Sequence, residues 1–239
     1  MSIFISFSGI ARQEFAIKFL DFFNSYGLKC WYDQHELYLG DELHSTIINK
    51  GINKSNYCVL IINQKYLDSN WPCEESDYFF QRYKNGEDIV MFPVLLDISK
   101  EDIANSRLKY LLSIKYQFLH TGDSIEQIGF QIINRIFQDK KKDCKFHTFD
   151  DMIDYFKRLP ITNSIDIYNA LIAFNDFDET NYRDRTIFLI CLIRLFNNNP
   201  YEKTIRKISY MIYENKKISF DIYKIIESIL LLSISNSLD

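Results

Sequence analysis

Short, unbroken apolar runs alternate with longer segments of helical spacing over the first 140 residues of the chain. Residues 57–62 form an apolar run between Asn56 and Asn63, which is typical of a strand buried on both faces of a parallel sheet. Similar but less regular runs predict four further strands, at residues 2–8, 28–32, 89–96 and 115–119. Apolar residues at helical spacing predict the intervening helices within residues 11–26, 41–54, 64–84 and 124–138.

This alternation predicts an α/β fold in which helices cover both faces of a parallel sheet. Five strands indicate a flavodoxin-like three-layer sandwich with a five-stranded parallel sheet of order 2-1-3-4-5. Ligands of such sheets bind at the carboxyl ends of the strands, at the switch point between the first and third strands. We therefore expect Phe7, Ser8, the loop at Asn63 and the helix after it to converge there, with Asp33 beside them.

From about residue 148 the strand pattern stops and only helical spacing continues. Five helices are predicted, at residues 149–158, 164–175, 182–196, 202–213 and 219–233. We therefore expect two domains, an α/β domain at residues 1–142 and a small all-α domain at residues 148–239 with a regulatory or oligomerisation role. The basic run from Lys140 to Lys142 is interpreted as a solvated linker between them.

Composition excludes several classes of partner. A formal net charge of -4 provides no general attraction to nucleic acid or to an anionic membrane surface. No charged leader followed by an apolar stretch begins the chain, and no uncharged run approaches the length that spans a bilayer. Five cysteines, an odd number without metal-ligand spacing, indicate a reduced cytoplasmic protein.

Trp71 and Glu75 stand four residues apart, shortly after the predicted third strand. If Pro72 lies in the first turn of a helix, where its missing N–H costs little, both side chains share one helix face. A carboxylate beside a large aromatic ring suits a sugar-cleaving site. The same spacing also fits a core tryptophan and an exposed first-turn carboxylate that the helix dipole favours. The pattern by itself leaves both interpretations open.

Three short motifs follow one another along residues 1–142. They are the run Ile3-Phe4-Ile5-Ser6-Phe7-Ser8, the loop from Asp33 through Leu39-Gly40-Asp41, and Ser69-x-Trp71-x-x-x-Glu75. Together they resemble a TIR (Toll/interleukin-1 receptor) domain of the bacterial NAD-cleaving type, here with a C-terminal helical extension. Phe7 replaces a common tyrosine, and Leu39 replaces a proline frequent in receptor-type domains. Both departures weaken receptor-style adaptor signalling more than catalysis.

The resemblance implies an enzyme that cleaves the bond between nicotinamide and ribose in NAD+. Glu75 is then the catalytic residue, and NAD+ is the substrate rather than a cofactor, with no metal or other cofactor required. The nicotinamide ring departs as a neutral group, so the carboxylate need only stabilise a ribosyl oxocarbenium ion. The expected substrate-binding residues are Phe7, Ser8, Arg12, Asp33, Leu39, Gly40 and Trp71. Trp71 and Phe7 would wall the site, and Arg12 would meet a phosphate.

The resemblance also implies products and partners. The product is ADP-ribose if water attacks the ion, or a cyclic ADP-ribose isomer if a nucleophile of the same molecule attacks it. We expect a role in antiphage defence, through NAD+ depletion or through a nucleotide that a downstream effector reads. TIR–TIR contacts, in which the loop at residues 34–41 completes the neighbour's site, imply a homo-oligomer. The alternative for that loop is an ordinary surface connection.

The sequence also bears on other functions and on other candidate residues. A non-catalytic TIR interaction module is the main alternative function. A response-regulator receiver is disfavoured, because it needs acidic residues at positions where this chain has Ser8, Gly9 and Asn63. Absence of a glycine-rich phosphate loop counts against a dehydrogenase. His35 and His44 lack a third metal ligand, and a nucleophilic Cys73 would need a paired base.

Overall fold

The computed structural model describes the greater part of the chain, namely residues 2–9, 11–31, 39, 42–158, 165–195 and 199–238. The chain packs into two compact units, residues 1–129 and 130–239. The predicted domain limits, 1–142 and 148–239, stay a prediction; the division by packing falls earlier, inside helix α7 (Glu126–Lys140).

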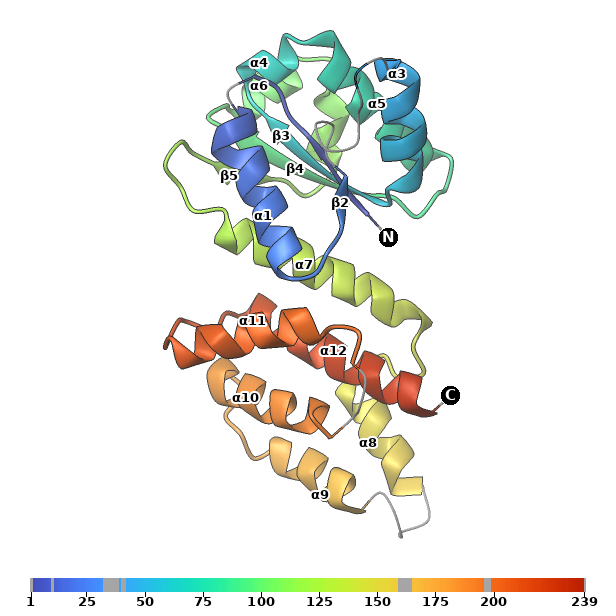
Figure 1. Ribbon diagram of the computed structural model, residues 1–239, viewed down its shortest axis with the longest axis vertical. Helices are drawn as coiled ribbons and strands as arrows, with labels where there is room; N and C mark the ends of the chain where they lie inside the picture. The colour runs from blue at the N-terminus through green and yellow to red at the C-terminus, as the bar shows by residue number, and fades with distance from the viewer. Residues whose placement is uncertain are drawn as a thin grey trace. The chain divides into compact units, whose positions relative to one another are not determined.

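A five-stranded, all-parallel sheet forms the centre of the first unit (Figure 1). Its strands are β1 (Ile3–Ser6), β2 (Cys30–Trp31), β3 (Tyr57–Ile62), β4 (Val90–Leu96) and β5 (Gln117–Leu119). Their order is β2-β1-β3-β4-β5. The predicted fold class and strand order are therefore confirmed, and β3 has the predicted bounds.

Helical segments connect the strands. After β1 come η1 (Arg12–Ala16) and α1 (Ile17–Ser25), and after β2 come α3 (Leu43–Thr46), η2 (Ile47–Gly51) and η3 (Ile52–Lys54). After β3 come α4 (Gln64–Leu67) and α5 (Asn70–Lys84), and after β4 come α6 (Lys100–Ala104) and η4 (Lys109–Ser113). Segments η1 and η2 are π-helical, which apolar spacing does not distinguish from α-helix. The sequence did not predict α6 and η4, because five residues are too few for a helical period.

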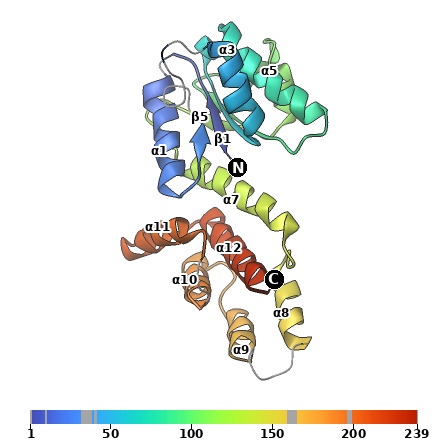
Figure 2. The ribbon, with the colours of Figure 1, turned by 45° about the vertical axis from the view of Figure 1, so that its right-hand side comes forward.

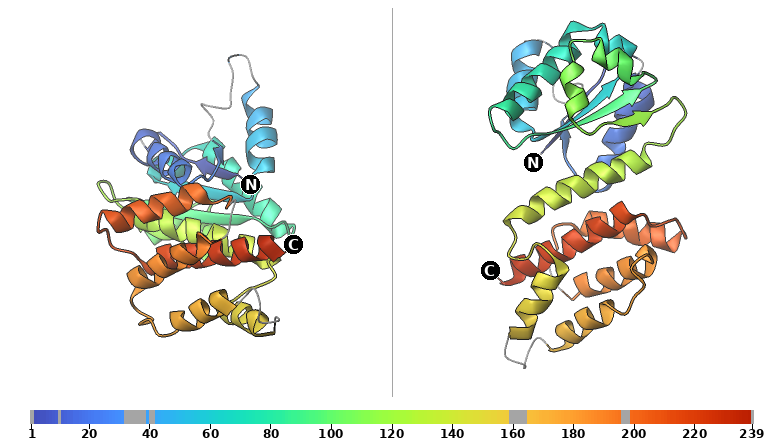
Figure 3. Two further views of the ribbon diagram at one scale, coloured as in Figure 1. Left: turned by 60° about the horizontal axis from the view of Figure 1, so that its bottom comes forward. Right: turned by 180° about the vertical axis from the view of Figure 1, so that it is seen from behind.

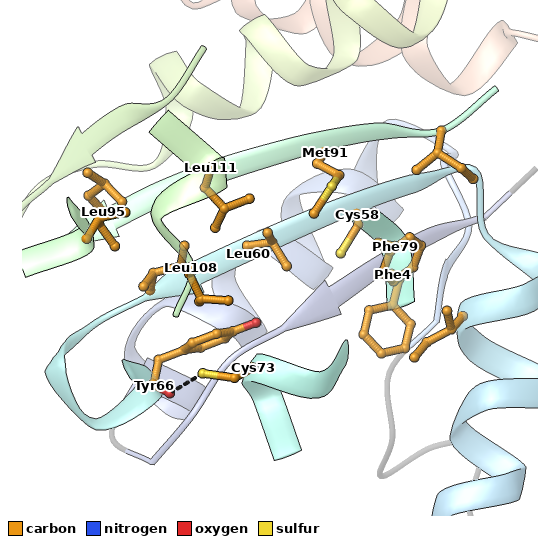
Figure 4. Close-up of a cluster of buried hydrophobic side chains, with 14 of the residues drawn as sticks. Phe4, Cys58, Leu60, Tyr66, Cys73, Phe79, Met91, Leu95, Leu108 and Leu111 are labelled. Carbon is orange, nitrogen blue, oxygen red and sulfur yellow. Dashed lines mark hydrogen bonds between the residues drawn. The ribbon is translucent and has the colours of Figure 1, made fainter. Parts of the chain in front are cut away.

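Helices cover both faces of the sheet, with α1 on one side and α3 and α5 on the other (Figure 2). The face toward α5 buries alternate strand residues, as the period of two requires. Phe4, Cys58, Leu60, Met91 and Leu95 belong to this cluster, together with helix residues such as Phe79 (Figure 4). Most residues of the opposite face, such as Ile5, Val59 and Ile61, are also buried, so the continuous apolar runs report a sheet covered on both sides.

Gly51 lies where η2 meets the sheet, and its substitution by alanine is expected to destabilise the first unit. A Cβ there would lie 2.8 Å from a ring carbon of Phe4 and 2.9 Å from the ring of Trp31. These rings are buried and stacked with centroids 5.0 Å apart. Overpacking of about 1–3 kcal/mol should outweigh the roughly 1 kcal/mol that alanine gains in a helix.

Chemical denaturation followed by tryptophan fluorescence measures this effect, because both tryptophans, Trp31 and Trp71, belong to the first unit. Lys54→Ala, at an exposed position three residues away, serves as the control and should change the free energy of unfolding by less than about 0.5 kcal/mol. A Gly51→Ala variant as stable as the original chain would contradict the close packing.

The second unit is helical (Figure 3). Its helices after α7 are η5 (Lys141–Asp143), α8 (Phe149–Arg158), α9 (Ile165–Phe174), α10 (Tyr182–Ile193), α11 (Glu202–Tyr213) and α12 (Phe220–Leu238). Helices α8 and α11 have the predicted bounds. Asn134 of α7 donates to Asp221 of α12 at 2.8 Å, and Gln138 donates to Ser228 at 3.0 Å. No helix among the described residues is long and apolar enough to cross a membrane.

The sequence interpretation of the basic run as a solvated linker fits only part of it, because Lys142 is exposed whereas Lys140 is partly buried. Lys140 ends α7, and its ammonium lies 4.9 Å from the ring centroid of Phe137 and 4.7 Å from that of Tyr201. Burial lowers the pKa of Lys140. Lys142 pairs with the buried Asp139 at 2.8 Å. The long alkyl stems let these lysines pack while their charges find partners, which a composition argument cannot anticipate.

Candidate active site

The loops after β1 and β3 meet at the switch point of the sheet. Strands β1 and β3 pair directly, with Ser6 opposite Leu60. Beyond them, Ser8 Oγ donates to Asn63 Oδ1 at 3.2 Å. The same Asn63 oxygen accepts from the Tyr66 N–H at 2.9 Å and caps helix α4. One asparagine thus joins the two loops and orients α4.

Helix α5 brings the predicted carboxylate to this edge. Ser69 precedes the helix in an extended conformation, and Trp71 and Pro72 occupy its first turn. Proline is tolerated there because first-turn N–H groups have no partner within the helix. Glu75 therefore lies in the second turn, on the side of the helix that faces the sheet, where its exposed fraction is 7%.

Glu75 and its neighbour Glu74 point in different directions. Ser6 Oγ, at the end of β1, donates to Glu75 Oε2 at 2.5 Å. Glu74 instead faces outward, with Oε2 3.5 Å from His44 Nε2 and its side chain 39% exposed. The interpretation of Glu75 as an exposed first-turn carboxylate is therefore wrong. Adjacent residues of a helix point about 100° apart, so Glu75 is buried while Glu74 faces outward.

Buried hydroxyl groups extend the contact between Ser6 and Glu75. The Ser6 Oγ lies 2.7 Å from the hydroxyl of Tyr66, which is fully buried. That hydroxyl also lies 2.7 Å from Pro72 O and 2.8 Å from Ser76 Oγ. Burial, and after it the charge of Glu75, raises the pKa of Tyr66 well above its usual value, so the phenol keeps its proton. The hydroxyl network is defined as Ser6, Tyr66 and Ser76.

Sequence reasoning did not single out this network. One signal for it existed, because Ser6 is a polar residue in an apolar strand buried on both faces. A buried hydroxyl needs a hydrogen-bond partner, so its position at the end of β1 indicates a polar group nearby. The identity of that group depends on a contact across 69 residues of chain, which local patterns do not contain.

Trp71 lies at the outer side of the site. It is half-buried against the core cluster, and its ring centroid lies 4.0 Å from that of His44 at an interplanar angle of 53°. His44 thus contacts both Trp71 and Glu74. Among the described residues, no group of three histidine, cysteine or acidic side chains is placed to hold a metal ion. His35 lies outside the described residues.

A model of the TIR domain family matches residues 3–131, which is more than half of the chain. The chain belongs to the TIR domain family. The match covers all five strands, both loops at the switch point and helix α5. It ends inside α7 and leaves the helices from α8 onward unassigned.

Two curated relatives carry names that describe NAD chemistry. "Probable 2' cyclic ADP-D-ribose synthase TcpO" of Methanobrevibacter olleyae is 29% identical over 143 residues, which are 58% of this chain and 39% of the relative. "NAD(+) hydrolase TcpA" of Theionarchaea archaeon (strain DG-70-1) is 29% identical over 101 residues, 42% of this chain and 30% of the relative. The matched stretches thus span well under half of the relatives' own lengths.

A solved structure is also similar to part of this chain. It contains the TIR domains of the activated Roq1 resistosome, which directly recognises the pathogen effector XopQ. Its sequence is 20% identical to that of this chain, and the TM-score is 0.48. The similarity covers 56% of this chain and 98% of that chain.

Cys73 lies in the TIR domain beside the site but is not placed as a nucleophile. Its side chain is buried, and its thiol donates to Tyr66 O at 3.3 Å (Figure 4). Burial is the main cause that raises the pKa of Cys73. A nucleophilic cysteine needs a lowered pKa and a paired base, so the structure disfavours this alternative.

The other predicted substrate-binding residues are only partly placed. Phe7 is half-buried directly after β1, and Ser8 is buried against Asn63. Arg12 belongs to η1, but its side chain is outside the described part of the chain. Leu39 is exposed, whereas Asp33 and Gly40 lie outside the described residues. The binding roles of these residues and the catalytic role of Glu75 stay predictions.

Proposed function

We propose that this TIR-domain protein is an NAD+ glycohydrolase or cyclase that cleaves the bond between nicotinamide and ribose. The observation that supports this most strongly is the buried Glu75, fixed through Oε2 by Ser6 at the switch point of the sheet. The names of the relatives, an NAD+ hydrolase and a cyclic ADP-ribose synthase, support the same chemistry.

The proposed reaction needs one negative charge in a poorly solvated place. Nicotinamide leaves as a neutral ring, so no acid has to protonate it, and positive charge develops on the ribosyl group. Glu75 stabilises that charge by electrostatic attraction, which burial strengthens because little water screens it. Burial, with the charge of Glu75 as a second cause, raises the pKa values of Cys58 and Tyr66. Both groups therefore stay neutral and do not compete with Glu75 for the cation.

Aromatic surface would complete the site. Phe7, directly after β1, and Trp71, on the helix after β3, offer partly buried rings on which the nicotinamide ring would stack. Such walls exclude water and strengthen the attraction between Glu75 and the cation. Attack by water then yields ADP-ribose, whereas attack by a group of the same nucleotide yields a cyclic ADP-ribose isomer.

The wider biological role belongs to the same proposal. The protein acts in the cytoplasm as a homo-oligomer, in which the loop at residues 34–41 of one TIR domain completes the site of the next. Leu39, the part of that loop that the structure describes, is exposed and therefore accessible to a neighbouring TIR domain. The reaction serves antiphage defence, through NAD+ loss or through a nucleotide product that a downstream effector reads.

The test is nicotinamide release from NAD+ by the purified full-length chain over a range of protein concentrations, beside Glu75→Ala. We expect release that depends on Glu75 and whose rate per chain rises with concentration, because assembly completes the site. Chromatography of the products distinguishes linear from cyclic ADP-ribose. No release at high concentration or under crowding would refute the proposal for the chain alone and favour a TIR interaction module.

A further inference from the structure

The hydroxyl network has more contacts than hydroxyl protons. Ser6 contacts Glu75 and Tyr66, and the Tyr66 hydroxyl additionally contacts Pro72 O and Ser76, which makes four contacts in all. Ser6, Tyr66 and Ser76 provide one proton each. All three hydroxyl groups lie in side chains that are at most 1% exposed. Water therefore does not readily supply the missing proton, and the protein itself must choose which contacts are hydrogen bonds.

The charge on Glu75 determines that choice. An ionised carboxylate only accepts, so Ser6 must donate its single proton to Glu75 Oε2. Ser6 Oγ can then only accept from Tyr66, whose one proton has two acceptors at 2.7 Å, Ser6 Oγ and Pro72 O. Donation toward Ser6 polarises the serine hydroxyl and strengthens its bond to the carboxylate. A negative Glu75 therefore favours a directed chain from Tyr66 through Ser6 to Glu75.

We propose that Ser6 is a positioning residue that holds the carboxylate of Glu75 in its reactive orientation, and that Tyr66 reinforces this hold through Ser6. This inference rests on the proposed function of the same site. These hydrogen bonds join three separately anchored elements, since Ser6 ends β1, Tyr66 lies on the capped helix α4 and Glu75 lies on α5. The orientation of Glu75 is thus set before substrate binds, which is the condition for electrostatic stabilisation without reorganisation.

Ser76 provides a matched control. It belongs to the same network, is as buried as Ser6, and lies 2.8 Å from the Tyr66 hydroxyl on α5. Without Ser76, Tyr66 still has its contacts to Ser6 and Pro72 O. A purely structural role of the network predicts similar consequences for Ser6→Ala and Ser76→Ala, whereas positioning of Glu75 predicts different ones.

Steady-state kinetics with NAD+ make the first comparison. Ser6→Ala is expected to lower kcat about 10–100-fold with KM changed less than about threefold, because orientation matters most in the transition state. Ser76→Ala should keep kcat within about threefold while its Tm falls as much as that of Ser6→Ala. Ser6→Cys, which retains a weak donor, should recover part of kcat. Equal losses of kcat in Ser6→Ala and Ser76→Ala would overturn the proposal.

A double-mutant cycle on unfolding provides a second readout that needs no catalysis. The effects of Ser6→Ala and Glu75→Ala, which each remove one partner of the contact, should be non-additive by about tenfold in the unfolding constant, followed by tryptophan fluorescence. Ser76→Ala and Glu75→Ala should be additive within about twofold. If the effects of Ser6→Ala and Glu75→Ala were additive in a chain that releases nicotinamide, the positioning role of Ser6 would be refuted but the proposed function would not. If they were coupled in a chain that releases no nicotinamide, the proposed function would be refuted but the contact between Ser6 and Glu75 would not.

Discussion

Glu75→Gln is expected to lower kcat for nicotinamide release by about 1,000-fold. Glutamine keeps the shape of the side chain and can still accept from Ser6, so the change removes mainly the negative charge. Two opposite charges about 4 Å apart attract by about 4 kcal/mol at an effective dielectric constant near 20, which corresponds to about three orders of magnitude in rate. Initial rates of nicotinamide release at saturating NAD+ measure this directly.

Glu74→Gln is the matched control for this prediction. Glu74 is the adjacent residue of the same helix, but it faces outward toward His44. Its exposed contact contributes little, so kcat should stay within about twofold and the Tm within about 2 °C. Equal activity of Glu75→Gln and the original chain, or an equal loss in Glu74→Gln, would show that the buried carboxylate is not the catalytic group.

Phe79→Ala is expected to destabilise the TIR domain by about 3–5 kcal/mol. Phe79 lies one turn beyond Glu75 on α5, is fully buried, and packs its ring against Phe4 with centroids 5.3 Å apart. Removing the ring leaves a cavity between α5 and the sheet that neighbouring rings cannot fill without losing their own contacts. Denaturation followed by the fluorescence of Trp31 and Trp71 measures the change in the free energy of unfolding.

Tyr83→Ala provides the comparison on the same helix. Tyr83 is 48% exposed, and its ring contacts Phe80 at the surface with centroids 6.1 Å apart. We expect a loss below about 1 kcal/mol. If the two variants lost equal stability, helix propensity rather than core packing would hold α5 on the sheet. The position of Glu75 would then not depend on the core contacts of α5.

Part of the site could be predicted because it depends on spacing within one element. The four-residue spacing from Trp71 to Glu75, with Pro72 between them, indicates a helix start and a common helix side without reference to any other part of the chain. The loops carrying Ser8 and Asn63 were expected to meet because strand order brings the ends of β1 and β3 together. Both inferences use regular geometry, which sequence patterns report well.

Other features required the tertiary structure. The sequence offers two adjacent carboxylates, and only packing shows that Glu75 turns toward Ser6 while Glu74 turns toward His44. Packing also decides the surroundings of Lys140, since Phe137 and Tyr201 partly cover a residue that the sequence interpretation placed in solvent. These outcomes depend on which side chains meet across long stretches of chain, and periodicity carries no information about such meetings.

The sequence by itself determined the five-strand parallel sheet, its order, the succession of helices and the family resemblance, because hydrophobic period and motif spacing are properties of neighbouring residues. Tertiary structure alone decided how the carboxylate is held. Ser6, Tyr66 and Glu75 come from three elements and meet within hydrogen-bond distance only when the sheet and its helices have packed. The direction of their hydrogen bonds depends on this packing, since each hydroxyl has one proton to donate.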